Sequence, residues 1–256
     1  MKPNFMKTLH YLLLFIMAVS LFNCKSKQGD PGPSGPALSG SINGIVSLTT
    51  ANGTIAADLS GVTVKTNKGD STTTNASGAW TLNESTGIYT ITYSKQGYGT
   101  TTTNGYSFVG GGNSFINGTS LSQVPNFTSS ITLDTMNSTS TRDRLVGVIM
   151  TITGQSQPEA RNFFIYYSTD SGVSSTNYMG MTTASVLPTA TSLTTNLSGS
   201  VLEAAGILQG QVVYIVVYPS SATAANSSKY VNESTGKTIY TALGQASNTQ
   251  NIAVPQ

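Results

Sequence analysis

The chain has 256 residues, of which only 9% are charged, and it contains one cysteine and one histidine at a formal net charge of +2. This length allows two domains of about 100–150 residues each. A single cysteine excludes a disulfide framework and a cysteine-based zinc site. The weak positive charge is unlike the basic footprint of nucleic-acid binders, so we expect no nucleic-acid partner.

The first 23 residues have the pattern of a secretory signal peptide. Lys2 and Lys7 give a basic start, and residues 11–22 form an apolar run. This run is shorter than the roughly 20 residues that span a bilayer, but it suits the middle of a signal peptide. Cleavage would remove His10 and leave ten basic and ten acidic residues, so the mature chain would be formally neutral.

Residues Leu21-Phe22-Asn23-Cys24 resemble the bacterial lipobox, in which the signal is cut before a cysteine that is then acylated. Leu21 and Cys24 stand where the pattern requires them, whereas Phe22 and Asn23 replace the usual small residues. The resemblance implies lipidation (palmitate) of Cys24 and anchoring in the bacterial cell envelope at the outer membrane, on its periplasmic or its exterior face. The alternative is a signal peptide followed by a free thiol.

Residues 24–38 predict a tether between the lipid and the first domain. They contain three collagen-like triplets, residues 29–31, 32–34 and 35–37. Three triplets are too few for a stable triple helix, which requires long Gly-X-Y repetition. An extended polyproline spacer, rising about 3.1 Å per residue, would span on the order of 40 Å. A collagen-type trimer is the alternative.

From residue 39 the pattern changes to short alternating β-segments. The clearest covers residues 88–93, where Tyr89, Ile91 and Tyr93 share one face and threonines occupy the other. Further strands are predicted at residues 44–48, 62–65 and 80–82. Glycine and asparagine turn signals separate these segments. Closely spaced short strands predict an all-β sandwich.

Five ordered motifs in this region resemble the carboxypeptidase regulatory-like domain. They are Gly44-Ile45-Val46, Gly61-Val62-Thr63-Val64, Thr73 to Trp80, Gly87 to Ile91, and Ser94-Lys95-Gln96-Gly97-Tyr98. The resemblance implies a transthyretin-type sandwich of about seven strands over residues 39–125, ending near Val124. It also implies a core position for Trp80. Gly78 would permit a tight turn, and Gly97 a close approach or a positive φ.

The second half, residues 126–256, is predicted to form another sandwich. Expected strands cover residues 131–133, 145–152, 163–167, 178–182 and 212–218, the last being long, apolar and β-branched. Leu208 to Tyr214 resembles the fibronectin type III stretch that leads to a tyrosine corner. This implies an immunoglobulin-like fold in which the Tyr214 hydroxyl bonds to nearby backbone. Residues 201–208 have helical spacing but are short and interrupted by Gly206, so no helix is predicted.

The mature chain lacks the side chains of most catalytic sites. Loss of His10 excludes imidazole-based triads and metal sites, and lipidation would remove Cys24 as a nucleophile. Ser234 and Lys237 have the Ser-x-x-Lys spacing of penicillin-recognising enzymes, but the flanks predict a loop and a strand rather than a helix. Gly236-Lys237-Thr238 ends like a phosphate-binding loop, but Val231 replaces its earlier glycine.

Acidic and aromatic residues supply the remaining candidates. The acids are scattered without a calcium-loop spacing, so we expect no metal, and a glycoside hydrolase would need two carboxylates brought within about 5–9.5 Å by folding. Tyr98, Tyr106 and Phe108, beside the Gly110-Gly111-Gly112 loop, are the candidate sugar-contacting residues. The alternative is that they belong to the core or an edge.

These observations predict an all-β protein with two consecutive β-sandwich domains after a signal peptide and a Gly/Pro-rich tether. We expect a non-catalytic, lipid-anchored envelope protein with a structural, adhesive or ligand-display role and no cofactor. Its expected partners are the membrane, through the lipid, and a polysaccharide or an envelope or host protein. A carbohydrate-binding lipoprotein is one alternative, because the transthyretin-type domain belongs to a carbohydrate-binding-like fold group. A hydrolase that uses acidic residues is the other.

Overall fold

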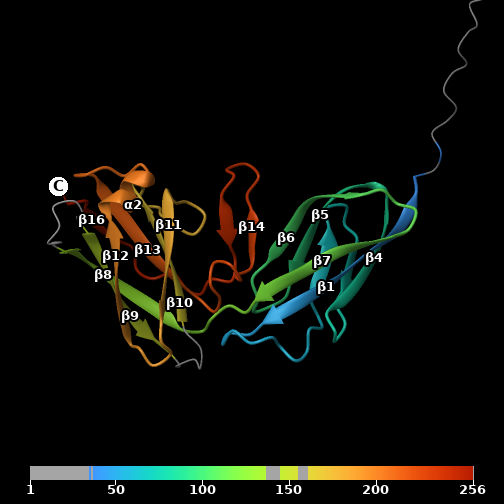
Figure 1. The fold of residues 1–256 in the computed structure, drawn as a ribbon, viewed down its shortest axis with the longest axis horizontal. Helices are drawn as coiled ribbons and strands as arrows, with labels where there is room; N and C mark the ends of the chain where they lie inside the picture. Colours follow the sequence, from blue (N-terminus) through green and yellow to red (C-terminus); the bar gives the residue numbers. More distant parts are fainter. Residues whose placement is uncertain (1–34, 36, 137–144, 155–160, 256) are drawn as a thin grey trace, which may run out of the picture. The chain divides into compact units, whose positions relative to one another are not determined.

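The computed structural model describes residue 35 and residues 37–136, 145–154 and 161–255 (Figure 1). The predicted signal peptide, Cys24 and most of the tether lie outside the described residues. The all-β prediction is confirmed: the described residues form strands throughout and one short helix. None of the described helical segments has the length and apolar content that a bilayer crossing requires.

Two sheets form what we call the first sandwich. Sheet 1 has the order β4-β1-β7, and sheet 2 has the order β3-β2-β5-β6. The bounds are β1 Ser39–Thr49, β2 Thr63–Thr66, β3 Ser71–Thr73, β4 Ala79–Ser85, β5 Gly87–Ser94, β6 Thr101–Phe108 and β7 Asn113–Ser122. In sheet 1, the central strand β1 pairs with β4 in antiparallel and with β7 in parallel orientation.

Alternation along the strands builds the core of the first sandwich. On β5, Tyr89, Ile91 and Tyr93 are fully buried, as the sequence pattern predicts. Trp80 is also buried, and its ring meets that of Tyr93 edge to face at 5.8 Å. A Cβ on Gly44 would lie 2.7 Å from the Trp80 ring, so this glycine makes room for the indole.

The seven strands β1–β7 end at Ser122, in agreement with the strand count that the resemblance implies. Gly78 and Gly97 both have φ of 78°, which confirms the expected turn and positive φ. Strands β3, β6 and β7 were not predicted, because threonine, serine, asparagine and glycine dominate them and leave little apolar alternation.

Two further sheets form the second sandwich. Sheet 3 has the order β12-β9-β8, and sheet 4 has the order β11-β10-β13-β16. The bounds are β8 Thr128–Met136, β9 Leu145–Thr153, β10 Arg161–Ser168, β11 Gly180–Val186, β12 Ser192–Ser198, β13 Val212–Ser220 and β16 Gln250–Ala253. Their facing sides share one buried cluster that includes Phe127, Val148, Phe163, Ile165 and Ile215.

Sheet 4 is covered on its other side as well. Phe164, Tyr166 and Val216 belong to a separate buried cluster, against which Tyr178 and Tyr240 pack. Tyr240 lies on the hairpin of β14 (Lys229–Val231) and β15 (Thr238–Tyr240), which forms a two-stranded sheet of its own. All eight residues of β10 are therefore buried.

Two expectations for the second half are wrong. Residues Gly199–Ala204 form a helix, α2, which Ser198 caps by accepting a hydrogen bond from the Val201 amide. The buried Leu202 anchors this single turn, so packing overrides the short, glycine-ended sequence. The Tyr214 hydroxyl makes no backbone hydrogen bond among the described residues, so the expected tyrosine corner is not observed.

Residues Ala37–Gln256 form one compact unit by their internal contacts. The connection between the sandwiches runs from the end of β7 at Ser122 to the start of β8 at Thr128. The predicted boundary between residues 125 and 126 lies in this connection and remains a proposal.

Candidate functional site

The connection between β13 and β14 contacts the end of the first sandwich. Ser228 Oγ accepts a hydrogen bond from the Ser122 amide at 2.6 Å, and the Ser122 hydroxyl donates to the Asn226 carbonyl at 3.0 Å. The Lys229 amide donates to the Thr101 hydroxyl at 3.2 Å. These hydrogen bonds hold residues 226–229 against β6 and β7.

Gly99 is the point of closest approach between these segments. A Cβ at this position would lie 2.6 Å from the Ala242 amide nitrogen and 2.7 Å from Ser228 Cβ. The Thr241 hydroxyl also reaches the Thr100 carbonyl at 2.5 Å. The absence of a side chain at Gly99 thus lets the backbones meet.

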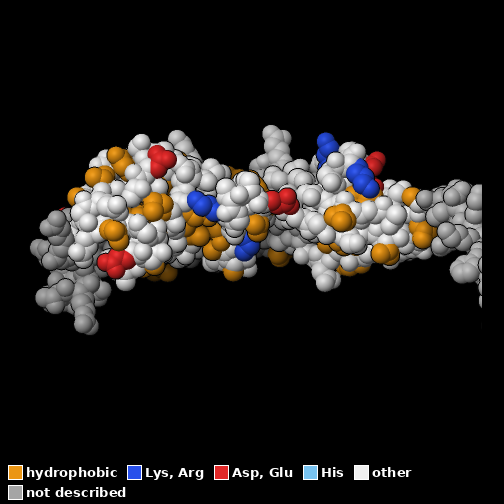
Figure 2. Space-filling view, turned by 90° about the horizontal axis from the view of Figure 1, so that it is seen from above, with side chains coloured by type: hydrophobic (Ala, Val, Ile, Leu, Met, Phe, Trp, Pro, Cys, Tyr) orange, Lys and Arg blue, Asp and Glu red, His pale blue; other side chains and the backbone are white. Residues whose placement is uncertain are grey.

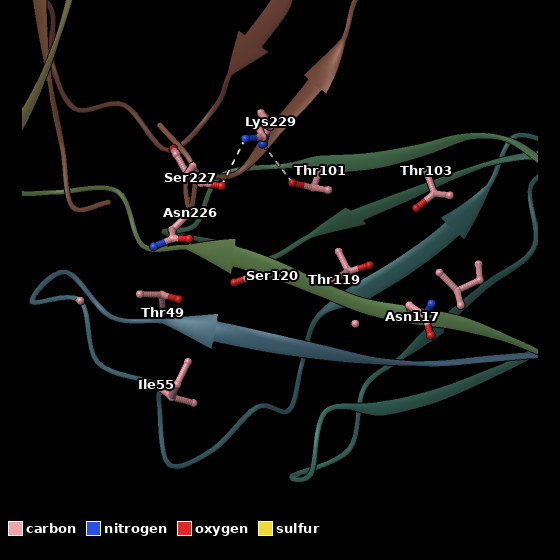
Figure 3. A pocket seen from close by; sticks show the side chains of 14 residues that line it. Thr49, Ile55, Thr101, Thr103, Asn117, Thr119, Ser120, Asn226, Ser227 and Lys229 are labelled. Atoms are coloured by element: carbon pink, nitrogen blue, oxygen red, sulfur yellow. Dashed lines mark hydrogen bonds between the residues drawn. The ribbon is translucent and has the colours of Figure 1, made fainter. Parts of the chain in front are cut away.

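A groove of about 720 Å³ opens beside this contact (Figure 3). We call it the junction groove. Its lining comes from the end of β1 and the following loop (Thr49, Gly53, Ile55), from β6 (Thr101, Thr103), from β7 (Ile116, Asn117, Gly118, Thr119, Ser120) and from residues 225–227 and 229. The groove therefore follows the side of the first sandwich where β6 and β7, the edge strands of sheets 2 and 1, come together.

The junction groove is lined mainly by hydroxyls, the side chains of two asparagines and backbone, with three apolar side chains and one cation. Lys229 Nζ donates to the carbonyls of Ala224 at 2.9 Å and Ala225 at 3.2 Å, so its charge is directed to backbone. No carboxylate lines the groove. Such a lining can exchange hydrogen bonds with a neutral polar ligand but offers no acid or base pair.

Two smaller pockets extend the junction groove. One, of about 290 Å³, shares Lys229 and reaches Thr102, Tyr230 and Thr238. The other, of about 220 Å³, shares Thr49, Gly53 and Asn226 and reaches Ser221. A ligand longer than one residue or one sugar ring would find further polar contacts on both sides.

The predicted aromatic candidates lie elsewhere. Phe108 is only 3% exposed and belongs to the core of the first sandwich, which is the alternative that the sequence left open: as the last residue of β6 it faces inward. Tyr98 and Tyr106 are half-buried and pack against the same core, and the Tyr106 hydroxyl bonds to Ser114 Oγ. None of the three lines the junction groove. The predicted lipidation site, Cys24, lies outside the described residues.

The structure agrees with the rejection of the Ser-x-x-Lys motif. Ser234 lies in the turn between β14 and β15, where its hydroxyl donates to Asn232 Oδ1 at 2.7 Å. Lys237 Nζ instead lies 4.7 Å from the centre of the Tyr178 ring and donates to the Tyr178 carbonyl. The pair is therefore part of the hairpin's packing.

The carboxylates that the structure describes have local roles. Hydrogen bonds from the Ser60 amide and hydroxyl lower the pKa of Asp58, and those from the Gly172 amide and the Asn177 side chain lower the pKa of Asp170. Glu84 is 5% exposed, and its Oε1 has no partner. Among the described residues, no group of three potential metal ligands occurs.

Burial is the largest cause of the remaining pKa shifts, which are those of tyrosines: Tyr93 in the first sandwich and Tyr166, Tyr167, Tyr178 and Tyr240 further along the chain. Desolvation, with lesser contributions from the neighbouring Tyr178, Tyr240 and Tyr218, raises the pKa of Tyr166 far above its ordinary value. Its hydroxyl is buried without a hydrogen bond. This environment is apolar and closed, so it supports packing rather than proton transfer.

The residues of the junction groove were not identified from the sequence. Most of them are threonines, serines, asparagines and glycines from four separate segments, and these types are abundant along the whole chain. The one available signal was the polar character of β6 and β7, in which threonine, serine, asparagine and glycine predominate.

Comparisons with known proteins give only distant matches, all of them to solved structures. No family model matches the chain, and no curated protein matches it. Among solved structures, a DUF3823 family protein from Parabacteroides merdae aligns at 15% identity and TM-score 0.27, over 72% of this chain and 91% of that chain. A DUF3823 family protein from Bacteroides ovatus aligns at 12% identity and TM-score 0.29, over 86% of this chain and 100% of that chain. The Bacillus anthracis TIE protein aligns at 10% identity and TM-score 0.24, over 86% of this chain and 32% of that chain.

Proposed function

We propose that this protein is a non-catalytic, lipid-anchored protein of the bacterial envelope that presents the junction groove to a ligand. The anchoring part rests on the signal-like leader and the lipobox-like residues that end at Cys24. The resemblance to carboxypeptidase regulatory-like and immunoglobulin-like domains supports a display role.

The neutral lining of the junction groove is the observation that carries the display role. Threonine, serine and asparagine side chains supply donors and acceptors, and the one cation is engaged with backbone. Charged side chains make up only 9% of the chain, and they are few and scattered on the face of the molecule that Figure 2 shows. A neutral, polar ligand fits such a surface, because it loses no ion pair and gains several hydrogen bonds.

A carbohydrate is the second candidate for the ligand, and the same lining favours it. The hydroxyls of a carbohydrate polymer both donate and accept hydrogen bonds, and so do the threonine and serine hydroxyls of the groove. Two smaller pockets that share lining residues with the groove suit a chain rather than a single ring.

The test combines anchoring with groove blocking in cells that express the full chain. Cys24→Ala should move the protein from the membrane fraction to the soluble fraction, and mass spectrometry of the wild type should show acyl chains on Cys24. Adhesion of intact cells to immobilised glycans and matrix proteins should fall about tenfold with Gly118→Trp, since a Cβ there meets only open space and the new ring would fill the groove.

Gly112→Trp is the matched control. A Cβ at Gly112 also meets open space, and this glycine does not line the groove. Adhesion that is equal in the wild type and Gly118→Trp would reject the groove as the binding site. An unmodified thiol on the wild-type protein would reject the anchor.

A further inference from the structure

The outward face of sheet 1 carries an exposed aromatic ring among neutral polar side chains. Phe115 on β7 is 57% exposed, whereas the next residue, Ile116, points to the opposite face of the sheet and is buried. An isolated exposed apolar residue would need no explanation. Phe115, however, lies in register with a row of polar residues that crosses all three strands.

Strand register aligns this row. Asn43 on the central strand β1 pairs with Thr81 on β4 and with Phe115 on β7. One pleat away, Ser41 pairs with Asn83 and with Asn113. Same-face neighbours along a strand are about 6.7 Å apart and strands about 4.8 Å apart, so the two rows cover about 7 by 10 Å. This area fits one or two sugar rings.

The two rows hold their amides in a fixed orientation. The Thr81 hydroxyl donates to Asn43 Oδ1 at 2.7 Å, and the Ser41 hydroxyl donates to Asn83 Oδ1 at 2.8 Å. Each of these two amide oxygens thereby accepts a hydrogen bond from a neighbouring strand. Among the described residues, neither Asn43 Nδ2 nor Asn83 Nδ2 has a partner, so two amide groups with hydrogens to donate are left for a ligand.

No charged side chain occurs on this face. The outward positions of β1, β4 and β7 hold only Ser, Asn, Thr, Ala, Ile and Phe, whereas Glu84 on β4 faces the interior. An anionic or cationic ligand would therefore find no counter-charge here. A neutral ligand with hydroxyls and an apolar C–H face matches both the amide donors and the ring.

We propose that this face, defined by Ser41, Asn43, Thr81, Asn83, Asn113 and Phe115, binds a neutral polysaccharide. One sugar ring stacks its C–H face on Phe115, and its hydroxyl oxygens accept hydrogen bonds from Asn43 Nδ2 and Asn83 Nδ2. The proposal deepens the carbohydrate-binding alternative but uses a surface separate from the junction groove.

Affinity electrophoresis of the full chain in detergent tests the proposal, in native gels that contain dextran, yeast mannan, laminarin or xylan. At least one polymer should retard the wild type. Phe115→Ala should raise the dissociation constant about tenfold or more, and Asn43→Ala about threefold to tenfold. Phe115→Tyr, which keeps the ring, should stay within about threefold.

Ile88→Ala is the matched control, because Ile88 is 68% exposed on sheet 2. It should leave retardation unchanged. Gly118→Trp distinguishes this face from the junction groove, because a polymer held in the groove would lose its retardation in that variant and keep it in Phe115→Ala. Absence of retardation by all four polymers would overturn the proposal. Retardation that survives Phe115→Ala, or that only Gly118→Trp removes, would overturn it as well.

Discussion

The strands of the first sandwich bury one face, whereas β10 in the second sandwich is buried on both. On β4 of the first sandwich, buried and exposed residues alternate from Trp80 onward. On β10, Phe163 faces the core shared with sheet 3, and Phe164 faces the cluster under the β14–β15 hairpin. A two-layer arrangement thus leaves an outer sheet face free for binding, while the added layer uses that face for packing.

Two buried tyrosines, one from each sandwich, differ in the hydrogen bonds of their hydroxyls. In the first sandwich, the Tyr89 hydroxyl donates to the Ser85 carbonyl at 2.6 Å and accepts from Lys68 Nζ at 2.9 Å. In the second sandwich, the Tyr166 ring is surrounded by Tyr178 at 5.0 Å and Tyr218 at 5.6 Å, and its hydroxyl has no hydrogen bond. Aromatic packing there replaces hydrogen bonding.

The largest expected effect comes from Phe163→Ala, which breaks the core of the second sandwich alone. Phe163 is fully buried, and its ring meets that of Phe127 edge to face at 5.7 Å. We therefore expect the free energy of unfolding to fall by about 3–5 kcal/mol. Urea unfolding followed by circular dichroism should show it. Fluorescence of Trp80, the sole tryptophan, reports on the first sandwich, and the urea midpoint that it measures should stay unchanged. Equal shifts by both probes would show that the sandwiches unfold as one unit.

Gly99→Ala should disturb the contact between the sandwiches at a smaller cost. Its Cβ would lie 2.6 Å from the Ala242 amide nitrogen, and moving backbone costs about 1–3 kcal/mol. Thermal unfolding measures the loss. Gly118→Ala, where the Cβ meets open space, should stay within about 0.5 kcal/mol. A similar loss in both variants would argue against a packed contact at Gly99.

Tyr89→Phe should weaken the first sandwich by about 1–1.5 kcal/mol, because it removes the hydroxyl that links Lys68 to the Ser85 carbonyl. Denaturant unfolding at pH 7, followed by Trp80 fluorescence, is the measurement. An unchanged midpoint would mean that water replaces both hydrogen bonds without cost.

Tyr166→Phe should change stability least at pH 7, within about 0.5 kcal/mol, because no hydrogen bond is lost. The stabilities of the wild type and of this variant should differ at alkaline pH. Desolvation raises the pKa of folded Tyr166, so the neutral phenol is favoured by folding. That stabilisation is complete below the unfolded pKa of about 10 and is lost as the pH rises above it.

The variant lacks this titration, so the wild type should lose about 1.4 kcal/mol more than Tyr166→Phe between pH 9 and pH 11. Urea midpoints at both pH values provide the comparison, with Tyr89→Phe as the second tyrosine variant. Parallel pH profiles of the wild type and Tyr166→Phe would contradict the buried, neutral phenol.

Sequence reasoning predicted the fold class where apolar residues alternate or run together, as on β5 and β13. It missed β6 and β7, since threonine, asparagine and glycine carry no periodic apolar signal there. It also missed that a third layer would cover Tyr166, because Tyr240, which packs there, lies more than 70 residues further along the chain.

The candidate surfaces were beyond sequence reasoning for a related cause. Asn43, Thr81 and Phe115 become neighbours only through the register of three strands, one of them paired in parallel. The junction groove depends on residues 225–229 lying against β6 and β7. For Phe108 the sequence left a sugar-contacting role and a core position open, and the alternation of its strand buries it in the core.

The parallel pairing of β1 with β7 has a mechanical consequence. The chain enters the first sandwich at the start of β1 and leaves it at the end of β7, and eight pairs of residues join the two strands side by side. Opposite pulls on Ser39 and Ser122 therefore shear these pairs simultaneously instead of peeling them apart one by one. Under tension between its two ends, the first sandwich would therefore resist unfolding through this ladder, with a lifetime set by the unfolding rate.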